Sequence, residues 1–250
     1  MGSGYAVTTA HALDEIARHN HHTVLLRANG VNGHLVTVEI PIKDWVRHSD
    51  SSVDLAVYRI SLKESGIDGG CFFVKPDTIA TPGATTFNGV SLGDDLFFPG
   101  LFWPHKGEEK NTPIIRAGML SAMPEEKVQA ELGPGNQKLI DAYLVETRSI
   151  GGLSGSPVFF YFDGGLTRYG KVVSPKAHFF LLGVVQGHYD AQVSLDDSVF
   201  DDRKEKVNMG VGIVIPATKL LEMLESDEVQ RARDVEEEED RKNTGFAPSQ

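Results

Sequence analysis

The sequence predicts an all-β fold of antiparallel strands, because its apolar residues fall in short runs separated by glycine and proline. Residues 36–42 alternate apolar and polar side chains, the period of a half-buried strand. Residues 54–60 and 210–215 are mostly apolar over lengths typical of buried strands. The chain has 26 glycines and 12 prolines, which punctuate these runs as turn residues. Short strands separated in this way favour a sandwich or barrel over alternating strand–helix units.

A helix is predicted after the last strand. Residues 217–224 follow Pro216 and place Leu220, Leu221 and Leu224 on one face, which can dock on the body of the protein. Residues 221–250 then hold ten Asp or Glu and four Lys or Arg. Like-charged runs are usually solvated. We therefore expect a disordered acidic tail over residues 234–250, with a binding tail as the alternative.

The amino-acid composition argues against several classes of function. With 40% hydrophobic and 24% charged residues, the 250-residue chain is typical of a globular protein, and it contains no apolar run long enough to span a membrane. A formal net charge of −11 argues against nucleic acid as a partner. Trp45 and Trp103 also lack the basic neighbours that base stacking uses. The single cysteine, Cys71, excludes an intrachain disulfide and is expected to be a small buried apolar residue.

Residues 7–13 contain the first candidate catalytic residue. An apolar strand ends in small residues, and His11 then opens a helical turn. A histidine on a rigid corner that faces a cleft can act as a general base. The alternative is a structural or merely exposed histidine.

Asp54 is the second candidate, because it enters an otherwise apolar strand. A buried carboxylate needs a charged or hydrogen-bonding partner. A histidine N–H would be such a partner and would keep the imidazole in the tautomer that a base requires. The alternative is an aspartate that caps a turn.

Ser154 is the third candidate, within the segment Gly151–Phe159. Glycines on both sides of Ser154 permit the backbone angles of a tight turn, which would expose its hydroxyl. Two backbone N–H groups at such a turn can stabilise an oxyanion. The alternative is a Gly/Ser-rich hairpin.

The three motifs together resemble those of the trypsin-like serine peptidases, in particular the bacterial Deg/Htr-related type. The order His, Asp, Ser is that of the chymotrypsin class, and the three residues lie 43 and 100 positions apart. Four further segments resemble later strands of this family in the same order: residues 93–100, 116–123, 182–187 and 210–216.

The resemblance implies two six-stranded antiparallel barrels with the site between them. The first barrel would span residues 1–88, the second 89–216 and a C-terminal helix 217–233. Ser154 would be the nucleophile, His11 the general base and Asp54 its orienting partner, with the N–H groups of Gly152 and Ser154 as the oxyanion hole. No cofactor is implied, and the partner would be a polypeptide substrate.

The sequence also departs from the family. His11 lies near the start of the chain, so we expect the first barrel to be incomplete at its N-terminus. We expect no PDZ module after the second barrel. The turn reads Gly-Ser-Pro at residues 155–157, where Htr-type members have Gly-Gly-Pro. The Gly-Ser-Pro motif resembles that of the glutamyl endopeptidases.

The family resemblance also assigns a substrate pocket. Arg148, six residues before Ser154, would lie at its base, and the strand 185–188 would form a wall, with Gln186, Gly187 and His188 near the entrance. An arginine there would disfavour cleavage after Lys or Arg and could bind a carboxylate. Alternatively, Arg148 pairs with Glu146 and leaves a small apolar pocket.

Two expectations concern binding and location. Residues 19–22 contain three histidines that are predicted to form a polar loop rather than a metal site. The first residues lack the features of a secretory leader, which slightly favours a cytoplasmic location. The alternative to a peptidase is a non-catalytic trypsin-fold protein that serves as a binding module or scaffold.

Overall fold

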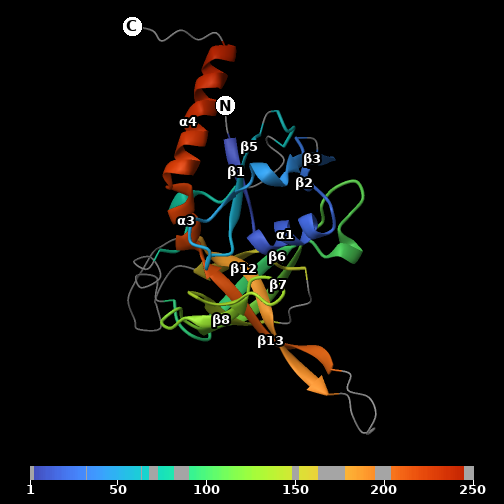
Figure 1. The fold of residues 1–250 in the computed structure, drawn as a ribbon, viewed down its shortest axis with the longest axis vertical. Helices are drawn as coiled ribbons and strands as arrows, with labels where there is room; N and C mark the ends of the chain where they lie inside the picture. The colour runs from blue at the N-terminus through green and yellow to red at the C-terminus, as the bar shows by residue number, and fades with distance from the viewer. Residues whose placement is uncertain are drawn as a thin grey trace.

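The structure is mostly β, with one closed barrel and few helices (Figure 1). It is a computed structural model that describes residues 3–31, 33–62, 64–67, 73–81, 90–147, 152–162, 178–194 and 204–244. The all-β prediction is therefore confirmed, together with one of the expected barrels.

Six antiparallel strands close the barrel in the order β10-β13-β12-β11-β6-β7. The pair β12–β13 continues beyond the barrel as a two-stranded ribbon (Figure 1). In chain order the barrel strands are β6 (Asp95–Gly100), β7 (Ile114–Ala122), β10 (Tyr143–Thr147), β11 (Pro157–Phe162), β12 (His178–Ser194) and β13 (Lys204–Pro216).

The barrel closes around alternate side chains of its strands. On β6, Leu96 and Phe98 are fully buried, whereas Phe97 between them packs edge-on against Phe179 of β12. This alternation follows from the two-residue period of a strand. Other large buried members of this core include Leu120, Val145, Val158, Leu182 and Val214.

The N-terminal part forms two small sheets where the first barrel was expected. A three-stranded sheet has the order β1-β5-β4, and β2 pairs only with β3 among the described residues. The helix α1 (Ala10–Arg18) joins β1 to β2. The strands are β1 (Ser3–Thr8), β2 (Thr23–Asn29), β3 (Leu35–Pro41), β4 (Val46–Arg47) and β5 (Ala56–Ser61).

Short elements complete the chain between these strands. A second hairpin, β8 (Val128–Glu131) and β9 (Gln137–Ile140), lies beside the barrel. In the described part of the chain, the short 3-10 helices η1, η2 and η3 cover Ile42–Asp44, Pro76–Thr78 and Trp103–His105.

One apolar cluster joins the N-terminal sheet to the barrel. Leu55 and Val57 pack with Val184 and Ile215 of the barrel and with Leu220 of the following helix. Burial of large aliphatic side chains contributes roughly 1.5–3 kcal/mol each. The cluster therefore holds the segment around residue 54 firmly against the barrel.

Among the described residues, two helices follow the last strand, where the sequence predicted a C-terminal helix over 217–233 and an acidic tail from residue 234. Helix α3 (Ala217–Leu224) matches the predicted helix, and a second helix, α4 (Asp227–Thr244), follows after a break at Glu225 and Ser226. Glu and Arg are good helix formers, and acidic residues in a first turn interact favourably with the helix dipole. Both conditions hold in α4, whose first turn contains Asp227 and Glu228.

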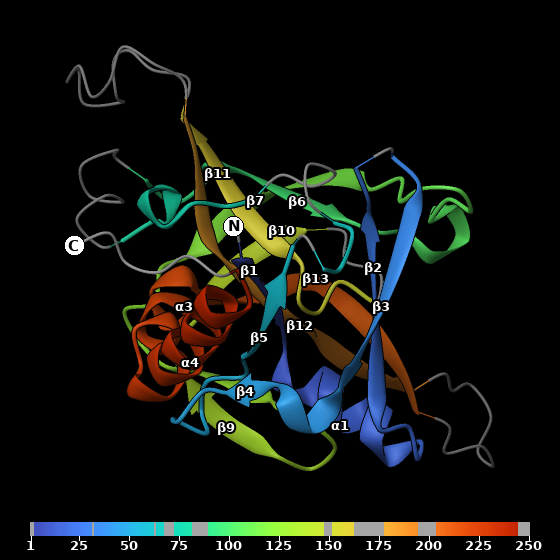
Figure 2. The same ribbon diagram turned by 90° about the horizontal axis from the view of Figure 1, so that it is seen from above.

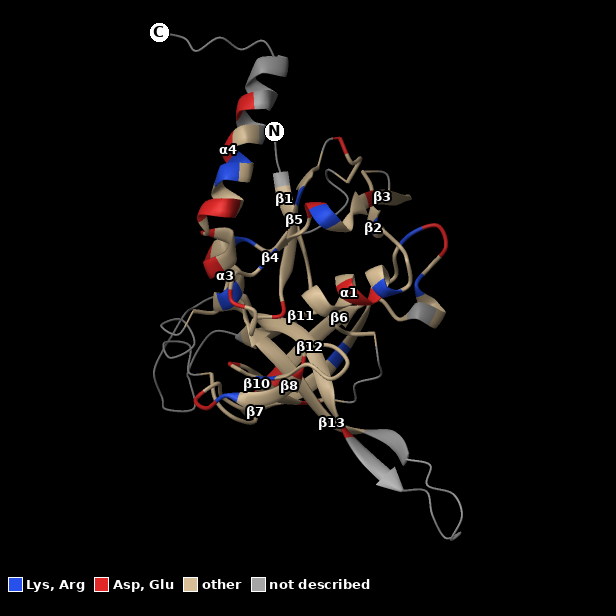
Figure 3. Cartoon of the chain, viewed as in Figure 1, with Lys and Arg blue, Asp and Glu red and all other residues tan. Residues whose placement is uncertain are grey.

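Figure 2 shows α3 and α4 on one side of the molecule and the β2–β3 hairpin on the opposite side. Figure 3 colours acidic residues red and basic residues blue, and both kinds occur in the coloured part of α4. Among the described residues, no helix has the length and apolar character needed to cross a membrane.

Candidate functional site

His11 lies in the first turn of α1, directly after β1. The helix is anchored by Leu13, which is buried among Ile40, Trp45 and Ala56. Because α1 begins at Ala10, His11 sits at a strand-to-helix corner, which is the local structure that the sequence predicted there. The side chain keeps 22% of its surface exposed.

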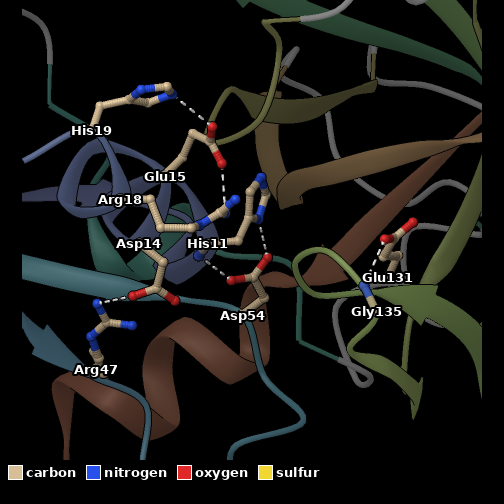
Figure 4. Close-up of polar contacts among 9 residues, drawn as sticks. All are labelled: His11, Asp14, Glu15, Arg18, His19, Arg47, Asp54, Glu131 and Gly135. Carbon is tan, nitrogen blue, oxygen red and sulfur yellow. Dashed lines mark hydrogen bonds and ion pairs between the residues drawn. The ribbon is translucent and has the colours of Figure 1, made fainter.

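Asp54 is buried and binds His11 through both of its oxygens (Figure 4). The backbone N–H of His11 donates to Oδ1 at 2.8 Å, and Nδ1 of His11 lies 2.5 Å from Oδ2. These contacts meet the requirement that a buried carboxylate be paired. They also place a hydrogen on Nδ1, so Nε2 of the neutral ring is left as the acceptor. The strand β5 begins two residues later, at Ala56.

Ser154 lies on a tight turn that leads into β11. The N–H of Ser156 donates to the carbonyl of Leu153 at 2.9 Å, and the N–H of Gly155 donates to Val185 at 2.8 Å. Both Gly152 and Gly155 have positive φ angles, +96° and +87°. The turn therefore depends on glycine at both positions. Leu153 is buried and fixes the turn on the barrel core.

The turn and the strand that leads to His11 touch each other. A Cβ on Gly155 would lie 3.1 Å from Oγ1 of Thr8 and 3.7 Å from the backbone nitrogen of Thr9. This close approach brings the end of β1 against the Ser154 turn, although the two segments are far apart in the sequence.

A cleft of about 570 Å³ contains His11 and Ser154 in its lining. Its walls come from α1, the Ser154 turn, the hairpin β8–β9 and β12. Among the described residues, no hydrogen bond joins the Ser154 hydroxyl to His11. The hydroxyl instead donates to the carbonyl oxygen of Gln186 at 3.0 Å. Within the same described part of the chain, the N–H groups of Gly152 and Ser154 have no hydrogen-bond partner.

The residues predicted to bind substrate differ in their placement. Gly187 and His188 line the cleft, and Nε2 of His188 lies 3.1 Å from Oδ1 of Asp190. Gln186 also lines the cleft, but it is buried, and its side-chain Nε2 donates to Oδ2 of Asp54. Arg148 lies outside the described residues, as does Cys71.

Charged residues on α1 complete one wall of the cleft. The carboxylate of Glu15 lies 2.5 Å from the guanidinium of Arg18 and 3.2 Å from Nε2 of His19 (Figure 4). Glu15 and Arg18 follow His11 at intervals of four and seven residues, so they share its helix face. This spacing is visible in the sequence, but Glu15 and Arg18 were not among the predicted site residues.

No pattern in the sequence indicated that the β8–β9 hairpin would line the cleft. Its residues Gln129, Glu131 and Gly133 line the cleft. On the opposite wall, burial raises the pKa of Tyr189, whose hydroxyl donates to the carbonyl of Gln129 at 2.7 Å. The described residues contain no group of three or more His, Cys, Asp or Glu side chains that could hold a metal ion.

The sequence matches no protein-family model and no curated protein in the comparisons made. The function must therefore be inferred from the geometry of the cleft.

Proposed function

We propose that this protein is a serine endopeptidase of the trypsin-like class, with His11, Asp54 and Ser154 as its catalytic triad. The observation that carries the proposal is the buried Asp54 carboxylate, which binds both the backbone N–H and Nδ1 of His11. A histidine held in this way beside a serine on a glycine turn has the parts needed for acyl transfer. The general triad mechanism is taken from chymotrypsin-class enzymes.

In the proposed reaction, Nε2 of His11 takes the hydroxyl proton while Oγ of Ser154 attacks the peptide carbonyl carbon. Asp54 stabilises the imidazolium that forms. The tetrahedral intermediate then collapses, the C–N bond breaks, and His11 gives its proton to the leaving amine. A water molecule repeats these steps on the acyl-enzyme and releases the acid product.

The N–H groups of Gly152 and Ser154 are the proposed oxyanion hole. Both are without a partner within the described part of the chain, so they can donate to a substrate oxygen. Preorganised donors of this kind contribute about 2.7–4 kcal/mol each to transition-state stabilisation.

Ser154 must turn away from Gln186 before it can attack. A serine hydroxyl changes its partner by rotation about one side-chain bond. Catalytic hydrogen bonds are often formed only when substrate is bound. We therefore propose that substrate binding moves the hydroxyl from the Gln186 carbonyl to Nε2 of His11.

The proposal includes a two-lobed, chymotrypsin-like arrangement. The N-terminal sheets carry His11 and Asp54, and the barrel carries Ser154. The cleft is lined by residues from both parts, which supports this arrangement. The N-terminal sheets would then be the counterpart of the first barrel.

A fluorophosphonate probe tests the nucleophile. Only an activated serine reacts with it at a useful rate. We expect Ser154 to be labelled, Ser154→Ala to abolish labelling, and His11→Ala to slow it at least about a hundredfold through loss of the general base. Intact-mass measurement and peptide mapping give both rate and site.

Ser156→Ala is the matched control for this experiment. A Cβ on Gly100 of β6 would lie 3.0 Å from Oγ of Ser156, so this hydroxyl packs against the barrel wall. Its removal should leave labelling largely intact. Equal labelling of the Ser154→Ala variant would contradict the proposal.

The second candidate is a non-catalytic binding module with the same fold. It is favoured by the hydrogen bond that holds the Ser154 hydroxyl on the Gln186 carbonyl rather than on His11. A correctly folded wild-type chain that does not react with the probe would support this candidate.

A further inference from the structure

Gln186 contacts Ser154, Asp54 and the β8–β9 hairpin at the same time. Its carbonyl oxygen accepts the Ser154 hydroxyl at 3.0 Å. Its side-chain Nε2 donates to the carbonyl of Glu131 at 2.9 Å and to Oδ2 of Asp54 at 3.4 Å. That same Oδ2 binds Nδ1 of His11.

A β-bulge directs this side chain inward. In the pairing of β12 with β13, Val185 faces Val214 and Gly187 faces Ile213, so Gln186 is the extra residue. A bulge interrupts the alternation of a strand and re-aims one side chain. Accordingly, Val185 and Gln186 are both buried although they are consecutive.

Each of the two amide hydrogens of Gln186 has an acceptor, one in the Glu131 carbonyl and one in the Asp54 carboxylate. A buried amide needs a partner for each hydrogen, and loss of one leaves a costly unpaired group. One partly positive amide hydrogen faces the Asp54 carboxylate, and it therefore reduces the negative potential that His11 experiences. This effect disfavours the imidazolium relative to a site without the amide.

We propose that Gln186 is a positioning residue that couples the β8–β9 hairpin to the His11–Asp54 pair. The inference rests on the proposed function in that it takes this pair as the acid–base pair of the reaction. The hairpin forms a wall of the cleft. A polypeptide that contacts the hairpin and displaces the Glu131 carbonyl thereby changes the hydrogen bonding of Asp54 and the basicity of His11.

Other charged groups also face the cleft around His11, and the test must leave them unchanged. They come from α1, β8 and β12 and are Glu15, Arg18, Glu131, His188 and Asp190. The substitutions below alter none of these groups.

The test measures the pKa of His11 by NMR titration and the rate of Ser154 labelling. Gln186→Met keeps a side chain of similar length but removes both N–H donors. We expect it to favour the protonated imidazole of His11 relative to the wild-type chain. Labelling should slow about tenfold, as expected from loss of a hydrogen bond to a charged group.

Gln186→Glu is the second variant, in case the methionine destabilises the fold. It keeps the shape of the side chain and places a carboxyl group beside Asp54. Above the pKa of that group, we expect a larger rise in the pKa of His11 than the methionine causes. The Nδ1 proton resonance of His11 should shift in both variants, because its acceptor oxygen has lost a donor.

Tyr189→Phe is the matched control. It removes another bond from β12 to the hairpin, at the carbonyl of Gln129, without changing the donors to Asp54. The pKa of His11 should stay unchanged. An equal shift in Tyr189→Phe, or no shift in either Gln186 variant, would overturn the inference.

The two readouts also separate this inference from the proposed function. A wild-type chain whose Ser154 does not react contradicts the peptidase proposal. The comparison of His11 pKa values needs no catalysis, so it still decides whether Gln186 tunes the pair.

Discussion

At Gly155 a single backbone angle determines how the Ser154 turn meets the strand before His11. The φ angle of +87° is strained for any residue with a Cβ. The space beside it is also restricted, since an added Cβ would lie 3.1 Å from Oγ1 of Thr8. The sequence indicated a glycine turn here. It could not show the contact with Thr8, because that contact depends on how the barrel and the N-terminal sheet pack together.

Gly155→Ala should lower the free energy of unfolding by about 1–3 kcal/mol, the usual cost of a non-glycine residue held at positive φ. Thermal or urea unfolding measures this loss. Gly187→Ala is the control, because Gly187 has no positive φ and an added Cβ would meet nothing within 4 Å. Equal losses in the two variants would show that backbone strain at Gly155 is not the cause.

At the scale of elements, α3 and α4 differ in how they contact the body of the protein. Leu220 and Met223 of α3 are buried against Ile215 and Val57. In α4, Val229 in the first part of the helix is buried, whereas Val235 is 57% exposed. Among the described side chains of α4, the beginning of the helix contributes Val229 to the apolar cluster.

Val229→Ala and Val235→Ala form a matched pair on this helix. The first should lower the free energy of unfolding by about 1.5–3 kcal/mol, because it removes buried methyl groups and leaves a cavity. The second should change it by less than about 0.5 kcal/mol, as for an exposed site. Urea denaturation followed by circular dichroism gives both values. A comparable loss in the Val235 variant would mean that the outer part of α4 is also docked.

The sequence predicted individual strands and helices better than it predicted the contacts between them. The strand predicted at 36–42 coincides closely with β3, and the helix at 217–224 with α3, because each pattern reflects burial on one face. The part of α4 beyond residue 233 was not predicted, because its charge run gives no apolar stripe, although its residues have good helix propensity. The inward direction of Gln186 was also missed, since a bulge changes the alternation that sequence patterns rely on.

At the scale of the whole molecule, the N-terminal sheets and the barrel share buried residues. Leu55 and Val57 belong to the same cluster as Leu181, Val184 and Ile215. In addition, Lys138 of β9 donates to Oγ of Ser51 at 2.9 Å. His11 and Asp54 thus lie on one side of a shared apolar interface and Ser154 on the other. The relative placement of the three residues depends on that interface staying intact.

We therefore expect the two parts to unfold together. Trp45 is buried in the N-terminal part, so its fluorescence reports on those sheets, and Trp103→Phe removes the only other tryptophan. In this background the urea midpoints from Trp45 fluorescence and from far-ultraviolet circular dichroism should coincide, as in a two-state transition. Leu55→Ala should lower both midpoints together, by an amount equivalent to about 2–5 kcal/mol for a fully buried leucine. A fluorescence midpoint at clearly lower urea than the dichroism midpoint would show that the N-terminal sheets unfold independently, and that the shared cluster does not hold His11 and Asp54 against the barrel.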